Sequence, residues 1–390
     1  MNVKSLCLGV MTTLITSISF GQTNSLVVPP NILLPRDTIV KNQLIASLND
    51  FLSQTKKPNK ENSLVLSSEL LQTSVLLDEM KDLGKSNKFK DENFYKPYLT
   101  NATQLTDNNF LIQLSYIGVN EGLPFLRASF ALIADKKGTQ FYFHSPLKQN
   151  TASWKIKKFG NTNVYFKNSL NSAKAKSYFK MVADYDKRLS APDLQTDFYC
   201  ADNFHEVLQL IGIDYKSDFN GYAHNSETAK ENDYNLNVNG TLTSEFAKFD
   251  PHDLWHDRLH NVLSTDIINR PVDEGTAYLY GGSWGISWSD ILGKFKTYAT
   301  ENPNADWISL YNESKNFDEK GKFPLNVDFV INALVVQKIE KEKGFSSVIE
   351  LLSCGKKEKG NENYFKALEK ITGISKSNFN DNIWKLIKAN

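Results

Sequence analysis

The first part of the chain changes from a helical to a strand-like hydrophobic pattern. In NQLIASLNDFLS and SSELLQTSVLLDEMKDLG, within residues 42–84, apolar residues recur at spacings of three and four, which predicts two helices. Next come NNFLIQLSYIGVNEG, PFLRASFALIADKKG and TQFYFHSPL, within residues 108–147. These segments are rich in β-branched and aromatic residues and are separated by Gly-containing turns, which predicts antiparallel strands. Together they indicate a small α+β domain over residues 26–150, whose sequence does not reveal its role.

From residue 151 the pattern alternates between strand and helix and then becomes helical. Strands are predicted in WKIKKFGNTNVYFKN and QTDFYCAD, and helices in SAKAKSYFKMVADYDKRLS and NFHEVLQLIG. A turn and a further strand are predicted in NGYAHNSETAKENDYNLNVNG. Beyond Pro271, four amphipathic segments follow, and the first three of them end in Gly, a common residue at helix C-termini. The sequence therefore predicts an α+β chain whose second domain, residues 151–390, has a mixed sheet and then a helical lobe.

The N-terminal segment has the pattern of a secretory signal peptide. Lys4 precedes a short apolar run, LCLGVMTTLITSISF, and Ser19 and Gly21 place small residues before Gln22. We therefore expect residues 1–21 to be removed on export, leaving a periplasmic or extracellular protein. A membrane anchor is the alternative interpretation, but the run is short for a bilayer span and no later stretch is long enough. No integral membrane segment is expected after cleavage.

Composition and charge narrow the classes of function. The chain has 390 residues and 41% hydrophobic residues, which is enough for more than one buried core. Its 45 Lys and Arg nearly balance its 44 Asp and Glu, so charge gives no reason to expect a nucleic-acid partner. After signal cleavage two cysteines remain, Cys200 and Cys354, and the sequence alone does not decide whether they pair.

A cluster of histidines is the strongest chemical signal. His252, His256 and His260 are three of the chain's six histidines, spaced four residues apart. Asp250-Pro251 or Asp253 can start a helix there, and residues four apart then share one face. Two such imidazoles can bind one metal ion, and Glu274, beyond the break at Pro271, is the best candidate for a third ligand. The alternative is a metal-free surface helix.

His252 and His260 lie too far apart along a helix, about 12 Å, to share an ion easily. We therefore expect the pair His256 and His260 to bind the metal, with His252 in a supporting or surface position. A site with three protein ligands leaves a position for water, as catalytic zinc sites do.

Two short motifs resemble those of a known peptidase family. His256-Asp257-Arg258-Leu259-His260 is similar to the H-E-x-x-H helix of zincins, and Asp273-Glu274-Gly275-Thr276-Ala277 is similar to the N/S-E-G-x-A element of gluzincins, in the peptidase MA-like clan. The C-terminal segment VDFVINALVVQKIEKEKGFSSVIELL and the final helices also resemble that family. The resemblance covers residues 154–390 and leaves out residues 26–150.

This resemblance implies a zincin-like domain with one zinc ion, bound by His256, His260 and Glu274. It implies that Asp257 activates a water molecule as general base and that the substrate is a peptide or a protein. The family has Glu where this chain has Asp257, so the carboxylate arm is one methylene, about 1.5 Å, shorter. A misplacement of about 1 Å can slow a reaction on the order of 100-fold.

Two functions therefore stay open: a secreted zinc metallopeptidase, and a catalytically impaired pseudo-peptidase that acts as a binding module. The oxyanion donor is also open among Tyr278, Tyr280 and His224. We expect Trp284 and Trp288 to lie in the core. We also expect Tyr234–Val238 to be the edge strand with which zincins bind their substrate.

Overall fold

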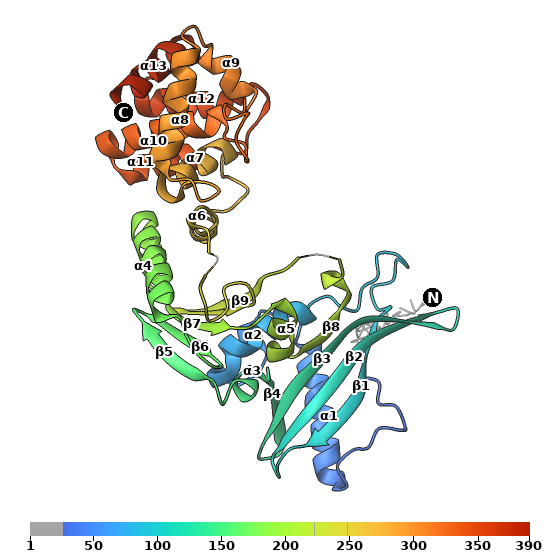
Figure 1. Cartoon of the computed structure of the whole chain (residues 1–390). Coiled ribbons are helices and arrows are strands. Elements are labelled where there is room, and N and C mark those ends of the chain that lie inside the picture. Colours follow the sequence, from blue (N-terminus) through green and yellow to red (C-terminus); the bar gives the residue numbers. More distant parts are fainter. Residues whose placement is uncertain (1–25, 222, 248) are drawn as a thin grey trace, which may run out of the picture. The chain divides into compact units, whose positions relative to one another are not determined.

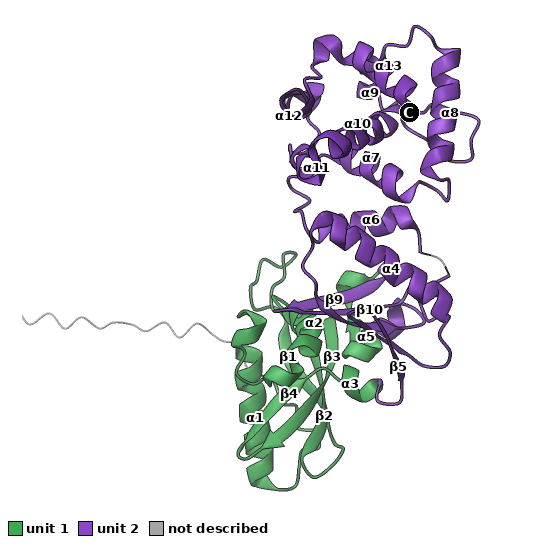
Figure 2. Ribbon diagram, turned by 90° about the vertical axis from the view of Figure 1, so that its left-hand side faces the viewer, with its two compact units in different colours: residues 1–150, 208–223 green, residues 151–207, 224–390 purple. Residues whose placement is uncertain are grey.

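The computed structural model describes residues 26–221, 223–247 and 249–390. The predicted signal peptide, residues 1–21, lies outside the described residues. The chain divides into two compact units, residues 1–150 with 208–223 and residues 151–207 with 224–390 (Figure 2). Both contain helices and a sheet, so the predicted α+β class is confirmed. No helix in the described ranges is both long and apolar enough to cross a membrane.

The first unit is built on a five-stranded antiparallel sheet with helices beside it (Figure 1). Its strands run in the order β1-β2-β3-β4, and β8 also pairs with β3. The two predicted helices and the three predicted strands are present, and Phe51 of α1 packs on Phe143 of β4 in the core. The helices and strands are α1 (Thr38–Ser53), α2 (Leu70–Met80), α3 (Leu147–Asn150), β1 (Lys96–Gln104), β2 (Asn109–Asn120), β3 (Leu123–Lys137), β4 (Gln140–His144) and β8 (Ile213–Lys216), with α5 (Phe204–Ile211) crossing the division between the units.

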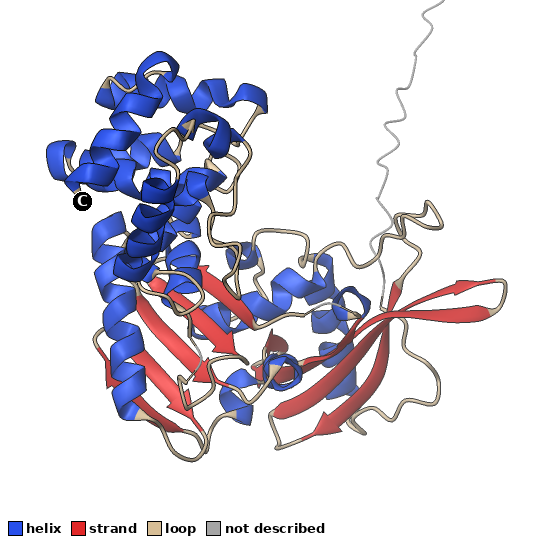
Figure 3. Cartoon of the chain, turned by 45° about the horizontal axis from the view of Figure 1, so that its top comes forward, coloured by secondary structure: helices blue, strands red, loops and turns tan. Residues whose placement is uncertain are grey.

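The second unit begins with a mixed sheet of five strands in the order β5-β6-β7-β10-β9. Figure 3 draws the strands of the chain in red and its helices in blue. The three inner strands are parallel, and both edge strands are antiparallel to their neighbours. Aromatic residues of α4 pack on this sheet, with the rings of Phe179 and Phe198 5.5 Å apart. The elements are β5 (Lys155–Phe159), β6 (Thr162–Phe166), α4 (Ser172–Leu189), β7 (Gln195–Cys200), β9 (Ser226–Glu231) and β10 (Tyr234–Asn239).

The expected edge strand is not at the edge. Residues 234–238 belong to β10, which lies between β7 and β9, and the edge strand is β9. The segment SETAKE of β9 is polar and mostly solvent-accessible, as edge strands often are, so its sequence lacks the apolar alternation that marks a strand.

The rest of the second unit is helical. Its helices are α6 (Pro251–His260), α7 (Arg270–Gly281), α8 (Trp288–Glu301), α9 (Trp307–Asn312), α10 (Val327–Lys343), α11 (Phe345–Leu352), α12 (Glu362–Thr372) and α13 (Phe379–Ala389). Short 3-10 helices in the two units are η1 (Asn59–Glu61), η2 (Ser67–Glu69), η3 (Ser217–Phe219), η4 (Lys359–Asn361) and η5 (Lys376–Asn378).

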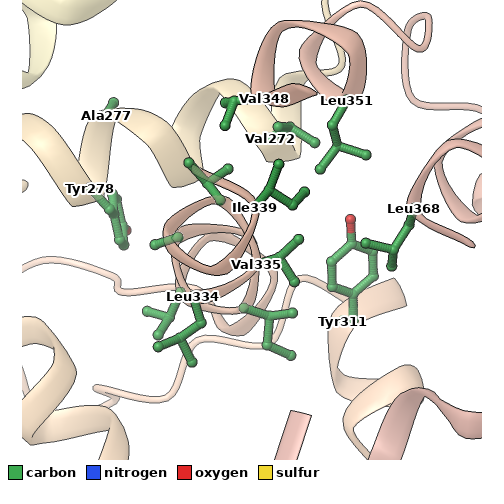
Figure 4. Close-up of a cluster of buried hydrophobic side chains, with 14 of the residues drawn as sticks. Val272, Ala277, Tyr278, Tyr311, Leu334, Val335, Ile339, Val348, Leu351 and Leu368 are labelled. Carbon is green, nitrogen blue, oxygen red and sulfur yellow. The ribbon is translucent and has the colours of Figure 1, made fainter. Parts of the chain in front are cut away.

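Helix α10 is the centre of this helical part. Its first half is buried on every side, so it is not the amphipathic helix that the sequence predicts. Leu334, Val335 and Ile339 of α10 meet apolar side chains of α7, α9, α11 and α12 (Figure 4). Helix α7, which carries Glu274, packs along α10 and is fixed there by this core.

The structure also tests the predictions for Trp284 and Trp288 and shows the state of the two cysteines. Trp288 is partly buried against the helical core, but Trp284 is 55% exposed, so its predicted core position is wrong. Trp284 follows the C-terminus of α7 in a tight turn and stacks on Phe323 instead. Cys200 and Cys354 are both free thiols, one buried and one partly buried.

Candidate metal centre

Helix α6 begins at Pro251, the first of the two starts that the sequence allows. The Asp250 side chain accepts a hydrogen bond from the His252 backbone N–H, and Pro251 occupies the first turn. Leu254, Trp255 and Leu259 are buried in the helical core. Their burial fixes the rotation of α6 about its axis, so the face that carries the histidines has a defined direction.

Helix α7 is locked against α6 by a short chain of hydrogen bonds. The Trp255 indole Nε1 donates to Thr276 Oγ1 at 2.8 Å, and the Thr276 hydroxyl donates to the Asp273 carbonyl at 2.6 Å. At the other end of α7, a Cβ added to Gly281 would lie 2.6 Å from the His252 backbone nitrogen. Only glycine allows this close approach of α7 to the first turn of α6.

Three side chains from these two helices point their donor atoms at one place. The Nε2 atoms of His252 and His256 are 3.1 Å apart, and Glu274 Oε2 lies 3.4 Å from the first and 3.8 Å from the second. In a tetrahedral zinc site with bonds near 2.05 Å, ligand atoms are about 3.3 Å apart. The separations in this group are therefore close to those that one zinc ion requires.

The hydrogen bonds behind the two imidazoles fix which nitrogen carries the proton. His252 Nδ1 donates to the Gly282 carbonyl at 2.7 Å, and His256 Nδ1 donates to Asp273 Oδ1 at 2.8 Å. In neutral imidazoles both Nε2 atoms are then bare acceptors that face each other. Two lone pairs at that distance repel, so this geometry requires a cation between them, either a proton or a metal ion.

The carboxylate next to the pair is held in its charged form. Burial alone raises the pKa of Glu274, but the His252 hydrogen bond and the positive charges of His256 and Arg270 outweigh it, so the pKa lies below its usual value. Burial lowers the pKa of His252, and its bonds to Glu274 and Gly282 raise it by more. The side chains of His252, His256 and Glu274 are 13%, 19% and 15% exposed, so the group is largely buried but still reachable from solvent.

A second group of three shares His256 with the first. Asp273 Oδ2 lies 3.2 Å from His260 Nε2, while its other oxygen is bonded to His256 Nδ1. In the described part of the chain, these are the two groups whose potential ligand atoms all lie within 4.8 Å of one another. Within the second group, Asp273 contacts the Nδ1 atom of His256, and this is the bond that orients the imidazole in the first group.

The predicted ligands are thus divided between the two groups. His256 and Glu274 come together, with His252 as the second imidazole, whereas His260 lies beside Asp273. The set His256, His260 and Glu274 is not one of the groups that the described residues bring together. Asp257 is solvent-accessible, and partial desolvation together with the nearby Asp253 charge raises the pKa of its carboxyl.

The three candidate oxyanion donors differ in what they contact. The Tyr280 hydroxyl donates to Glu340 Oε2 at 2.7 Å, and the ring of His224 stacks on Phe204. The ring of Tyr278 lies 5.8 Å from that of His252, so this tyrosine adjoins the group. Burial raises the pKa of Tyr278 to about 12, which keeps its hydroxyl protonated, and this hydroxyl is already hydrogen-bonded to Ser283 and to the backbone of Asn326.

The sequence also contains signals for His252 and Asp273, which are outside the predicted ligand set but belong to these two groups. His252-Asp253-Leu254-Trp255-His256 repeats the H-D-x-x-H pattern one turn before the pair that was chosen. Asp273 directly precedes Glu274, and on a helix adjacent residues can reach different neighbours of the same site. Two imidazoles with one carboxylate form a ligand set that suits zinc or another first-row transition metal.

Comparison with protein-family models and with curated proteins gives no match for this chain.

Proposed function

We propose that the chain is a zinc-dependent metallopeptidase of the zincin type, with one zinc ion held by His252, His256 and Glu274. The observation that carries this proposal is the convergence of the three donor atoms, with separations of 3.1–3.8 Å. The carboxylate of Asp273 behind His256 supports it further, because carboxylate-oriented histidines are typical of zinc sites. When bound, zinc would polarise a scissile carbonyl and lower the pKa of water at the site.

The proposed ligands change which acid is expected to act as the base. Asp253 directly follows His252 and holds the position that Glu occupies in H-E-x-x-H, as Asp257 does for the pair His256 and His260. We therefore assign Asp253 to accept a proton from the attacking water and to pass it to the leaving amine. Hairpin β9–β10, whose outer strand is the sheet edge, leads into α6, which agrees with the resemblance to zincins.

The experiment is a matched pair of variants, Asp253→Glu and Asp257→Glu, in the chain from residue 22 to 390, assayed on a peptide library. Each restores the longer carboxylate arm, one turn apart on the same helix. We expect Asp253→Glu to raise the cleavage rate by at least about tenfold, because the shorter arm misplaces the base. Asp257→Glu should leave the rate unchanged. The opposite result would indicate that His256, His260 and Glu274 are the ligands instead.

The second candidate function is a zinc-bearing pseudo-peptidase that binds a peptide or protein without cleaving it. The short aspartate at both 253 and 257 favours it, since neither position has the glutamate of the family motif. A protein that binds one zinc ion yet cleaves nothing, even as Asp253→Glu, would support this function. Cleavage that is lost in Asp253→Asn would exclude it.

A further inference from the structure

A pocket lies in the second unit, away from the histidine group. It has a volume of about 730 Å³ and is enclosed by β5, the start of the parallel strands, helix α4 and the end of α6. This size is typical of sites for small organic ligands, about 300–1,000 Å³. Arg258 is the residue of α6 that lines it. Arg258 is two residues after His256, about 200° around the helix, so the pocket and the histidine group use opposite faces of α6.

The floor of the pocket is a polar patch made by strand register. Thr162, Thr196 and Asn235 are aligned across the three parallel strands β6, β7 and β10. Asn237 follows Asn235 on the same face, because side chains alternate along a strand. The Asn237 Oδ1 atom is buried and has no hydrogen-bond partner among the described residues. A buried acceptor of this kind requires a donor, and because Asn237 lines the pocket, a ligand can supply one when the amide turns Oδ1 toward it.

The walls of the pocket are aromatic. Phe159 of β5 and Phe179 of α4 stack with ring centroids 5.6 Å apart, and Tyr178 packs edge-on against Phe179. These rings add apolar lining beside the polar floor. A ligand that fits both surfaces has a planar ring system with a polar group at one edge.

The charge of the lining selects an anion. Five cationic and two acidic side chains line the pocket, and Arg258 is already paired with Asp186 through two hydrogen bonds. The other acid, Asp193, accepts a hydrogen bond from Asn161. Within the described ranges, three of the lysines form no ion pair with an acid and are free to meet a ligand; they are Lys158, Lys176 and Lys187.

We propose that this pocket binds a small aromatic anion that carries an N–H or O–H donor. The lysines meet its acidic group, the rings of β5 and α4 cover its aromatic part, and Asn237 accepts its donor. This proposal does not depend on zinc or on peptide cleavage, so it is tested independently of the proposed function.

The probe is 8-anilinonaphthalene-1-sulfonate, an aromatic sulfonate with an N–H donor, titrated by fluorescence into the chain 22–390. N-phenyl-1-naphthylamine, which lacks the sulfonate, is the neutral comparison. We expect one sulfonate site per chain, weaker binding at high salt, and at least about tenfold weaker binding of the neutral dye. The double variant Lys176→Gln/Lys187→Gln should lose about tenfold in affinity for the anion and none for the neutral dye.

The matched control is Lys341→Gln/Lys343→Gln, which removes two exposed lysines from the end of α10, outside the pocket. It should change the affinity less than twofold, and circular dichroism should give both double variants the same melting temperature. The proposal is overturned if the chain does not bind the sulfonate, if it binds several molecules with equal affinity, or if the two double variants behave alike.

A second comparison tests the donor. Indole-3-carboxylate and benzofuran-3-carboxylate differ only in the ring N–H, and each is used to displace the bound sulfonate dye. The indole acid should displace it at about a tenfold lower concentration, because it alone can donate to Asn237. Equal displacement by the two acids would overturn the role given to Asn237.

Discussion

His252 and His256 face each other across one turn of α6, with their Nε2 atoms 3.1 Å apart and their Nδ1 atoms bonded to oxygen acceptors. This arrangement leaves two acceptor nitrogens in contact unless a cation lies between them. Glu274 Oε2 adds a negative charge on the same side, 3.4 Å from His252 Nε2. The relationship between these three residues is the basis of the proposed metal centre.

Replacing Asp273 by Asn should weaken zinc binding by about 10- to 100-fold, because His256 loses the carboxylate that orients its ring. Competition with a chromophoric chelator measures the affinity. Asp381→Asn, at an exposed position of α13, is the control and should bind zinc like the parent chain. An unchanged affinity in Asp273→Asn would mean that this bond does not support a metal ligand.

Three glycines should respond differently to the same change to alanine. Gly281→Ala should weaken zinc binding, since the added methyl group would meet the backbone of His252 at 2.6 Å and move α7 away from α6. Gly275→Ala should lower the free energy of unfolding by about 1–3 kcal/mol, because its Cβ would lie 2.5 Å from Asn332 Cβ in the packing of α7 on α10.

Gly293, in α8, is the matched control for both. An added Cβ there meets nothing within 4 Å, so Gly293→Ala should stabilise the protein by up to about 1 kcal/mol through higher helix propensity. Urea unfolding of the three variants gives the free energies, and chelator competition gives the affinities. If all three variants had the same stability and affinity, the close helix contacts would have no energetic role.

The two cysteines should be poor nucleophiles in the folded protein. Burial raises the pKa of Cys354 from about 9 to about 11 and that of Cys200 to about 12, so both are protonated thiols at neutral pH. Iodoacetamide at pH 8 should label neither on the time scale that labels both in urea, as followed by mass spectrometry. Rapid labelling of Cys354 in the native protein would contradict this prediction.

The same shifts predict how stability depends on pH. A thiol whose pKa is higher in the folded state binds its proton more tightly there, so it stabilises the fold below about pH 9 and loses that contribution between about pH 9 and pH 11. The free energy of unfolding should therefore fall across this range, and it should fall less steeply in Cys354→Ser. If the free energy of unfolding fell equally steeply with pH in the variant, the loss of stability would come from other groups.

The sequence predicted the parts of the site that depend on local structure. It offered Asp250-Pro251 as one of two possible starts of α6, because a cap and a proline act within one turn, and it placed His256 and Glu274 on neighbouring helices. It favoured the pair 256–260 over the pair 252–256, whereas the structure groups His252 with His256 and Glu274. Both pairs have the same spacing, and the choice depends on where α7 meets α6, which Gly281 and the core around α10 determine.

The two wrong predictions, for the edge strand and for Trp284, have a common cause. The edge position of β9 depends on strand pairing between segments far apart in the sequence, and its charged residues hide the strand pattern. Tryptophan is a residue type that is often buried, but Trp284 lies at the surface because it is in the turn after α7. In each case the local pattern was insufficient because contacts between distant segments determine the result.

The proposed metal centre is tested most directly by measuring zinc content. Elemental analysis is applied to the chain 22–390 and to the variants His252→Ala, His260→Ala and Glu274→Ala. We expect about one zinc per chain in the parent protein and in His260→Ala, and loss of zinc in His252→Ala and Glu274→Ala. Zinc that is retained in His252→Ala but lost in His260→Ala would contradict the assigned ligands. A parent chain that holds no zinc and takes none up would contradict the metal centre itself.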